Sequence, residues 1–211
     1  MSTARLILFA LGLTGLLTTA TAADSARWWR GNLHTHSFWS DGDDFPEMIA
    51  ERYKLNGYHF LAFTDHNTLH TSNKWVNTES AKSAKLAYPK YAARWSKGWI
   101  ETRPAAKDGQ TEVRLKLLSE YRGKFEEPGR FQLLQGEEIT DSAMNLPIHI
   151  NASNIRELIR PQGGKTVRET ISNNLLAVQA QAARVGQPIL AHLNHPNFGW
   201  AVTAEDMAAV I

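Results

Sequence analysis

Three short segments near the beginning of this chain concentrate side chains that can bind metal ions. His34 and His36 are separated by one residue, Asp41 follows in a Ser-Asp-Gly sequence, and Asp65 and His66 are adjacent. Because side chains alternate along an extended strand, His34 and His36 point the same way only where the backbone between them is extended. We therefore interpret these segments as a metal site at the ends of two strands.

The second half of the chain adds imidazole and carboxylate groups after strand-like runs, at Glu137 or Glu138, at His149, and at His192 or His195. Adjacent residues of a strand face opposite sides, so only one of the two glutamates can face the site. His192 and His195 are three residues apart and also point to opposite sides of an ideal strand. Imidazole and carboxylate ligands together suit Zn, Mn or Fe. Because six or seven such ligands exceed the needs of one ion, we expect two or three divalent metal ions.

A cluster of metal ions predicts hydrolysis. Neighbouring ions can bridge a hydroxide and lower the pKa of bound water towards roughly 7. At a spacing of about 3.5–4 Å they also stabilise the charge that develops on the oxygens of an ester during displacement. Phosphoester hydrolysis is the reaction that suits this chemistry best, and a carbamate or carboxyl ester could use the same nucleophile.

The first elements that must position these residues alternate between strand and helix. Residues 28–33 and 58–63 have the composition of strands, and residues 46–55 have that of a helix, with Pro46 in its first turn and Gly57 just beyond its end. This β-α-β order favours a parallel sheet with right-handed crossovers. Parallel sheets and barrels carry their sites at the carboxyl ends of the strands, which is where the histidines fall.

The later elements continue the pattern. Further strands are expected at 131–135, 146–151 and 187–193. A capping box at 166–169 begins a helix that runs to about Val185, before Gly186. A second such sequence at 203–206 begins a last helix, and the sequence stops inside it. We therefore expect the fold to be incomplete at its C-terminus.

Residues 68–130 differ from the rest and read as a long excursion between two core strands. They contain Trp75, Trp95 and Trp99, and between Lys74 and Lys124 twelve basic residues stand against five acidic ones. Helices are expected at 80–95 and 111–125. Such a segment could cover a site as a lid, or it could be a solvated basic face.

The first 22 residues have the features of a secretory signal peptide. Arg5 is their one charged residue, an apolar run extends from residue 6 to 17, and a small-residue cleavage site ends at Ala22. The run is shorter than the roughly 20 residues of a comfortable membrane span. We expect cleavage, export and no stable membrane association afterwards; an uncleaved anchor is the alternative. The absence of cysteine excludes disulfides and thiolate ligands and fits a periplasmic or secreted protein.

The remaining residues, 23–211, suffice for one domain with a sizeable core. Without Arg5 the balance is 22 basic against 21 acidic residues, which is close to neutral. A nearly neutral, exported chain is a poor candidate for nucleic-acid binding. We expect a small, anionic ester as the partner instead.

Several of these sequences resemble the motifs of the PHP superfamily, the polymerase and histidinol phosphatase domains. The resemblance lies in 31–36, 40–42 and 63–67 for the first two motifs, 136–139 for the third, and 149–152 and 194–197 for later ones. It extends over about 28–211, interrupted by the excursion. It implies an α/β fold, a distorted (β/α)7 barrel, with two or three bound metal ions.

Matching the motifs residue by residue implies a set of metal ligands: His34, His36, Asp41, His66, Glu138, His149 and His195. It favours Glu138 over Glu137 and His195 over His192. Asp65 is then expected to orient a ligand imidazole, and His192 to contact substrate or to lie in the core. The late Asp-x-His pair of such families is absent from this sequence.

The function expected from the sequence is therefore that of an exported, metal-dependent phosphoric ester hydrolase. Hydrolysis of carbamate or carboxyl esters on the same fold is one alternative. A catalytically silent metal-binding module, without the late Asp-x-His ligands, is another.

Overall fold

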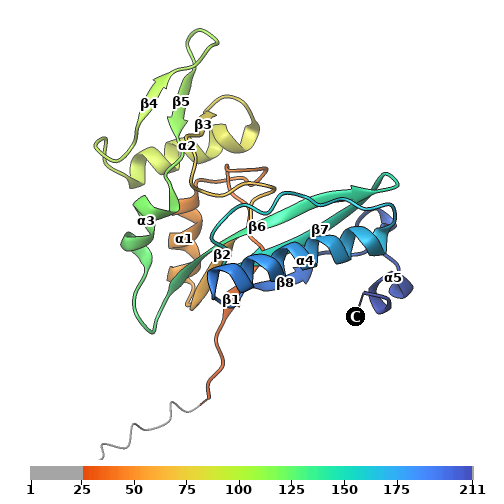
Figure 1. The fold of residues 1–211 in the computed structure, drawn as a ribbon. Helices are drawn as coiled ribbons and strands as arrows, with labels where there is room; N and C mark the ends of the chain where they lie inside the picture. Colours follow the sequence, from red (N-terminus) through yellow and green to blue (C-terminus); the bar gives the residue numbers. More distant parts are fainter. Residues whose placement is uncertain (1–25, 211) are drawn as a thin grey trace, which may run out of the picture.

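The computed structural model describes residues 26–210, so the expected signal peptide (1–22) lies outside the described residues. No helix within 26–210 is long and apolar enough to cross a membrane. The described chain combines a central five-stranded sheet with a smaller three-stranded one, and helices cover both (Figure 1).

The central sheet has the strand order β1-β2-β6-β7-β8. Its strands are β1 (Gly31–Asn32), β2 (Phe60–Phe63), β6 (Gln132–Ala143), β7 (Leu146–Ser153) and β8 (Leu190–Leu193). β1, β2 and β6 pair in parallel, and β7 is antiparallel to both of its neighbours. β7 is thus the one strand of this sheet that runs in the opposite direction, and its first residues lie beside the carboxyl ends of the others.

The predicted α/β class is confirmed, and the expected parallel pairing is present at β1, β2 and β6 but not at β7. A short turn joins β6 to β7, and so close a connection can only reverse the chain direction. The five strands curl into an open half-barrel (Figure 1). The complete (β/α)7 barrel implied by the resemblance is not seen in residues 26–210 and stays a prediction.

Helix α1 (Pro46–Leu55) has the bounds predicted for it. Pro46 occupies the first turn, where its missing N–H costs nothing, and Gly57 follows the helix with a positive φ of 73°. The helix packs beside β2, with Ala50, Leu61 and Phe63 in one buried cluster. It thereby connects the carboxyl end of β1, which carries His34 and His36, to the amino end of β2, and His66 follows the other end of β2.

Helix α4 (Val167–Val185) also has its predicted ends. The Thr166 side chain accepts a hydrogen bond from the backbone N–H of Glu169, and Gly186 ends the helix in the left-handed conformation with φ 64°. Figure 1 shows α4 lying along β7 and β6. Its residues Ile171 and Val178 share a buried cluster with side chains of these strands, Ile139, Ile148 and Ile150.

The excursion forms a subdomain of two helices and three strands: β3 (Trp75–Asn77), α2 (Lys82–Arg94), β4 (Thr102–Pro104), β5 (Thr111–Arg114) and α3 (Leu118–Phe125). The helix predicted at 80–95 is present as α2, but the helix predicted at 111–125 is wrong in its first part. Residues 111–114 are a strand because they pair with both β3 and β4. These partners lie far away in the sequence, so a local pattern does not reveal them.

The subdomain packs against the turn that carries Asp41. Phe38, Trp39 and Phe45 are buried with residues of α2 and β5 in one cluster. Lys74 also donates a hydrogen bond to the carbonyl oxygen of Trp39. These contacts give the turn a rigid apolar support.

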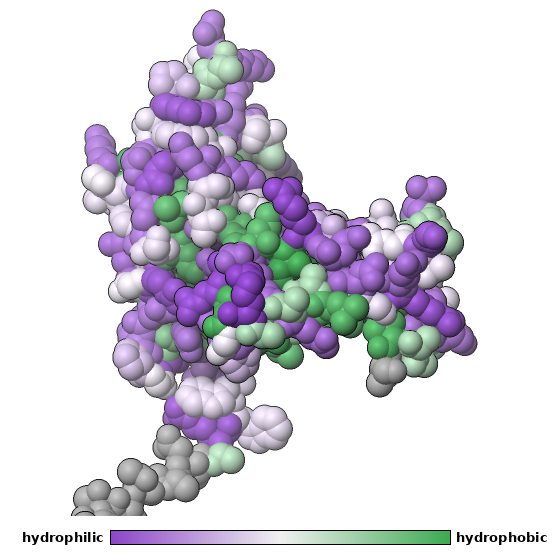
Figure 2. Space-filling model, viewed as in Figure 1, coloured by the Kyte–Doolittle hydropathy of each residue, from purple (hydrophilic) through white to green (hydrophobic). Residues whose placement is uncertain are grey.

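A cavity of about 640 Å³ lies at the amino ends of β2, β6 and β8, where Phe60, Gln132 and Leu190 contribute to its lining. None of the predicted metal ligands lines it. Figure 2 shows apolar residues across the middle of one face and towards the C-terminal end. Exposed apolar side chains of the C-terminal half include Leu176, Leu190 and Met207.

The last described elements are a short 3-10 helix, η1 (Phe198–Trp200), and helix α5 (Ala204–Ala208). The predicted capping box is present at the beginning of α5, where Thr203 and Asp206 exchange hydrogen bonds. Arg168 of α4 forms an ion pair with Asp206. This pair fastens the last helix to the central layer.

Candidate metal centre

The structure brings the seven predicted ligand side chains into one cluster, in which five histidines lie around the fully buried carboxylate of Glu138 and Asp41 contacts two of them. Most come from the segment after a strand or from the first half of the reversed strand β7, and Glu138 comes from the middle of the long strand β6. His34 and His36 follow β1, Asp41 lies in the next turn, His66 follows β2, Glu138 is within β6, His149 is within β7 and His195 follows β8.

The first group of histidines contacts Oε2 of Glu138. His34 Nε2 lies 3.1 Å from this oxygen and His36 Nε2 lies 2.8 Å from it. The two Nε2 atoms are 3.0 Å from each other. Three ligand atoms thus form a small triangle in which every side is close to 3 Å.

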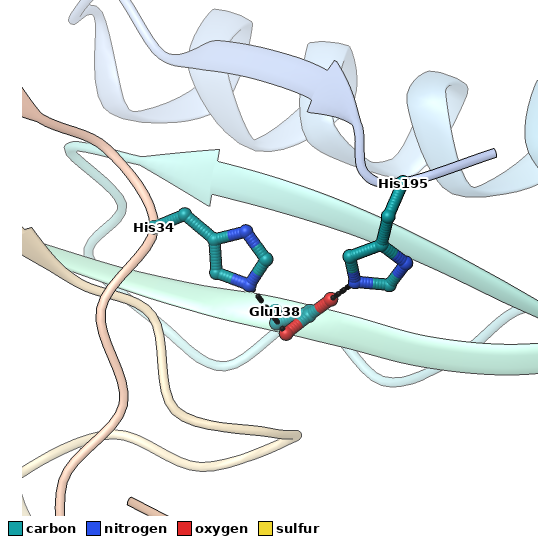
Figure 3. A group of neighbouring side chains, drawn as sticks. All are labelled: His34, Glu138 and His195. Atoms are coloured by element: carbon teal, nitrogen blue, oxygen red, sulfur yellow. Dashed lines mark hydrogen bonds and ion pairs between the residues drawn. The ribbon is translucent and has the colours of Figure 1, made fainter. Parts of the chain in front are cut away.

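The second group contacts Oε1, the other oxygen of the same carboxylate. His149 Nδ1 lies 3.1 Å and His195 Nε2 lies 3.2 Å from Oε1. Figure 3 shows His34 and His195 approaching the two oxygens from opposite sides. Glu138 is therefore shared between two sets of imidazoles.

Asp41 and His66 extend the first group towards solvent. Asp41 Oδ1 lies 2.7 Å from His36 Nδ1, and Asp41 Oδ2 lies 3.5 Å from His66 Nε2. A carboxylate on the Nδ1 side of an imidazole fixes the tautomer that leaves Nε2 free to bind a metal. The position of Asp41 therefore suits either a ligand or a group that orients His36.

The turn around Asp41 requires a glycine. A Cβ atom on Gly42 would come within 2.4 to 2.5 Å of backbone atoms of His36 and Ser37. The backbone N–H groups of Ser40 and Gly42 both donate to the carbonyl oxygen of Ser37 at 3.0 Å. The Ser-Asp-Gly sequence thus folds directly back on the His36 peptide, and this fold brings Asp41 to the imidazole.

His66 is held by the strand beside it. Its Nδ1 lies 2.5 Å from Thr140 Oγ1. Asn67 has φ 47°, and its side chain exchanges two hydrogen bonds of 2.9 Å with the backbone of Thr140. These contacts direct His66 Nε2 towards Asp41. Asn67 belongs to the Thr-Asp-His-Asn sequence, but its role depends on Thr140, which is distant in sequence.

Asp65 contacts the turn and His70, and it touches none of the ligand imidazoles. Its carboxylate accepts hydrogen bonds from the Ser37 backbone N–H at 2.8 Å, from Ser40 Oγ at 2.6 Å and from His70 Nε2 at 2.7 Å. Burial alone would raise the pKa of Asp65, but the hydrogen bond from His70 and the others keep it below its usual value. Asp65 is therefore ionised and holds the turn in place.

His70, which matches no motif, completes this arrangement. Burial lowers its pKa, so the ring is neutral and donates from Nε2 to Asp65. The Tyr121 hydroxyl, whose pKa burial raises well above its usual value, donates to His70 Nδ1 at 2.8 Å. Trp39 stacks on the His70 ring at a centroid distance of 5.0 Å. His70 is thus a structural residue, as expected of a histidine outside the motifs, but its contacts with Tyr121 and Trp39 could not be read from the sequence.

His192 lies beside the centre without reaching Glu138. Its Nε2 is 3.5 Å from Asn151 Nδ2, and its Nδ1 is buried with no hydrogen-bond partner among the described atoms. Burial lowers the pKa of this imidazole. The structure thus separates His192 from His195 as strand geometry predicted. Sequence reasoning also missed Asn151 and Asn194, whose hydrogen bonds involve the centre.

The electrostatics of the centre depend on the buried carboxylate. Burial would raise the pKa of Glu138, but hydrogen bonds from His149, His36 and Asn194 lower it far below its usual value. Burial likewise opposes the charge on His36, yet Glu138 and Asp41 together raise its pKa to about 9. Glu138 is therefore ionised, although its side chain is shielded from solvent.

The donor atoms fit a divalent cation. Two ligand atoms bound to one ion at about 2.1 Å lie about 3.0 to 3.4 Å apart at octahedral to tetrahedral angles. The triangle of His34 Nε2, His36 Nε2 and Glu138 Oε2 has sides of 3.0, 3.1 and 2.8 Å. Three sets of residues each offer three ligand atoms that lie within 4.8 Å of one another. These sets are His34–Glu138–His195, His36–Asp41–His66 and His66–Glu138–His149. Nitrogen and oxygen donors without sulfur suit Zn, Mn or Fe.

No family model matches the chain, and no curated protein matches it significantly. A solved structure from Bifidobacterium adolescentis, described as a candidate metal-dependent phosphoesterase, is similar at a TM-score of 0.39 and 14% identity. That similarity covers 86% of this chain and 73% of the other.

Proposed function

We propose that this chain is a metal-dependent phosphoesterase of the PHP type that acts on small anionic esters. The single observation that carries the proposal is the sharing of one buried carboxylate, Glu138, between two sets of imidazole nitrogens. A buried anion that bridges two sets of ligands is the arrangement that a cluster of two or more ions needs.

Within this proposal the metal ions would supply the chemistry, and the ligands would hold the ions in place. Bound divalent ions would supply an activated water and would neutralise the charge that develops on the ester oxygens. Glu138 would lie between the two ligand sets, with His34 and His36 on one oxygen and His149 and His195 on the other.

The surroundings of the centre support a substrate that arrives from solvent. The Asp41 side chain is 69% exposed and that of His195 is 37% exposed, whereas Glu138 is inaccessible. One side of the ligand set is therefore open, on the side of the turn and of the segment after β8. The substrate would be a phosphomonoester or a phosphodiester, and export would expose the enzyme to such esters outside the cytoplasm.

Metal content and turnover test the proposal together. The protein would be purified without added chelator, its Zn, Mn and Fe measured by elemental analysis, and its activity measured on p-nitrophenyl phosphate and bis-p-nitrophenyl phosphate. We expect two or three ions per chain and turnover that a chelator abolishes and added metal restores. Finding at most one ion and no turnover would sink the proposal.

The same assay separates the competing ester chemistry. Carboxyl and carbamate esters, such as p-nitrophenyl acetate and a p-nitrophenyl carbamate, would be offered at equal concentration. Phosphoesters should be hydrolysed with a kcat/KM at least ten times greater. A reversed preference would keep the metal centre and replace the phosphoesterase with an esterase.

A further inference from the structure

Two buried asparagines connect Glu138 to the backbone that precedes His34. Asn194 Nδ2 donates hydrogen bonds to Glu138 Oε1 at 2.8 Å and to Asn151 Oδ1 at 2.7 Å. Asn151 Nδ2 donates in turn to the carbonyl oxygen of Leu33 at 2.8 Å. Asn194 is 5% exposed and Asn151 is completely buried. A continuous chain of amide hydrogen bonds therefore runs from the end of β1 to the shared carboxylate.

The topology of the sheet places both amides between ligand-bearing strands. Asn151 of β7 lies directly opposite Glu138 of β6, and on its other side it lies opposite His192 of β8. Asn194 immediately precedes His195, and its backbone N–H donates to the carbonyl oxygen of His149 at 2.9 Å. A shift of either amide would therefore disturb β6, β7 and the segment after β8, each of which carries a predicted ligand.

Asn194 differs from the other groups that contact the Glu138 carboxylate, which are all imidazoles: His34, His36, His66, His149 and His195. An imidazole nitrogen that binds a cation uses its lone pair and no longer donates a hydrogen bond from that atom. The amide N–H of Asn194 has no such conflict. Among the described contacts, it is the one donor to Glu138 that can persist when the imidazoles bind metal.

We propose that Asn194 is a positioning residue that fixes the orientation of Glu138 for metal binding, and that Asn151 holds Asn194 and the end of β1 in register. A neutral amide suits this role because it donates to the carboxylate and adds no charge to the centre. Both hydrogens of Asn194 Nδ2 are in use, so the amide cannot turn without losing a bond. The role of Asn194 rests on the proposed function, since it requires Glu138 to bind metal.

Metal affinity tests this role without any measurement of turnover. The metal-free wild type and the variants Asn194→Leu and Asn194→Ala would be titrated with Zn²⁺, and separately with Mn²⁺, in competition with a chromophoric chelator. Loss of a partner that orients a metal ligand weakens affinity about 10- to 100-fold. We expect a loss of this size in both variants. Asn151→Leu should cause a smaller loss, since it acts through Asn194.

Asn174 provides a matched control for the stability cost of removing a buried amide. It is also completely buried, and its Nδ2 also donates to a carboxylate, Asp141 Oδ2, at 2.7 Å, and to the Thr170 carbonyl oxygen at 2.8 Å. Asn174→Leu should lower the urea midpoint of unfolding about as much as Asn194→Leu does. It should leave the affinities for Zn²⁺ and Mn²⁺ within twofold of the wild type.

The outcomes distinguish two kinds of failure. Wild-type affinity in folded Asn194→Leu and Asn194→Ala would overturn the positioning role alone, and so would an equal loss in Asn174→Leu. A wild-type chain that binds neither ion would contradict the proposed function and the positioning role together.

Discussion

His34 Nε2 and His36 Nε2 face each other at 3.0 Å, although one residue separates them in sequence. Thr35 between them is buried and held on both sides: its N–H donates to Thr64 Oγ1 at 3.0 Å, and its carbonyl oxygen accepts from Thr64 N–H at 2.8 Å. These bonds fix the peptides on both sides of Thr35, and both imidazoles reach the same oxygen, Glu138 Oε2. Two imidazole nitrogens held at this spacing suit one shared cation, which would replace the proton on His36.

Replacement of the shared carboxylate should remove the cluster. In Glu138→Gln the bridging anion becomes a neutral amide, which binds divalent ions poorly. We expect the metal content to fall to at most one ion per chain and kcat/KM to fall at least about 100-fold, beyond the effect typical of an outer partner. Elemental analysis and phosphoesterase assays measure the two effects, with far-UV circular dichroism to check folding. Retention of the full metal content would contradict the central role of Glu138.

Loss of His34 should weaken metal binding, whereas loss of a histidine outside the centre should not. His34→Ala removes one corner of the ligand triangle, so we expect weaker Zn²⁺ binding and at least about 100-fold lower kcat/KM. His59 is the matched control because its Nδ1 accepts a hydrogen bond from the Arg30 N–H and it lines the cavity at the other end of the sheet. His59→Ala should bind metal as the wild type does. Equal effects of the two substitutions would argue against a specific centre.

Asp65 should matter for stability through the turn that it holds. Asp65→Asn removes the charge that accepts hydrogen bonds from Ser37, Ser40 and His70. Hydrogen bonds to a buried charge are worth about 1.5 to 3 kcal/mol each, so we expect a loss of about 2 to 4 kcal/mol after relaxation. Urea denaturation in the presence of a chelator measures it without any contribution from metal. The exposed Asp43→Asn is the control and should change stability by less than about 0.5 kcal/mol.

Glu137 should make stability depend on pH. Its Oε1 accepts from the Ile159 N–H at 2.6 Å, on the side of β6 away from Glu138, and burial raises its pKa to about 8. The folded state therefore binds one more proton than the unfolded state between the ordinary glutamate pKa near 4.5 and the folded value near 8. Stability should fall as pH rises through that window, by at most about 1.4 kcal/mol per unit.

Glu137→Gln isolates this effect, because the amide keeps the acceptor and has no proton to lose. The difference in unfolding free energy between variant and wild type should grow from pH 5 to pH 8 in urea titrations of the metal-free protein. If the unfolding free energies of the variant and the wild type changed with pH in the same way, Glu137 would have the same pKa in the folded and unfolded states.

Local patterns predicted the elements that are stabilised locally. The ends of α1 and α4 follow from Pro46, the Thr166 cap and Gly186, all of which act within a few residues of the helix end. The strand ends that carry His34 and His66 are recognisable for the same reason. Since parallel strands meet at one edge, their grouping could be predicted as well.

Elements that depend on distant partners could not be predicted. Residues 111–114 form a strand because Trp75–Asn77 and Thr102–Pro104 supply its two neighbours. The bonds between Asn194 and Glu138 and between Thr140 and His66 join residues that are 56 and 74 positions apart. No spacing rule connects such pairs, because the strand order brings them together.

The two oxygens of Glu138 face different histidines. A metal ion bound near one oxygen would therefore change the affinity for an ion near the other. The first ion to bind would polarise the carboxylate and fix its torsion, which alters the free energy of binding the second. Metal uptake should therefore be a cooperative process with unequal stepwise constants, and by linkage each ion must alter the retention of the other by the same factor. Partial removal by a weak chelator would then leave a mixture of fully loaded and empty molecules if the coupling is positive, and singly loaded molecules if it is negative.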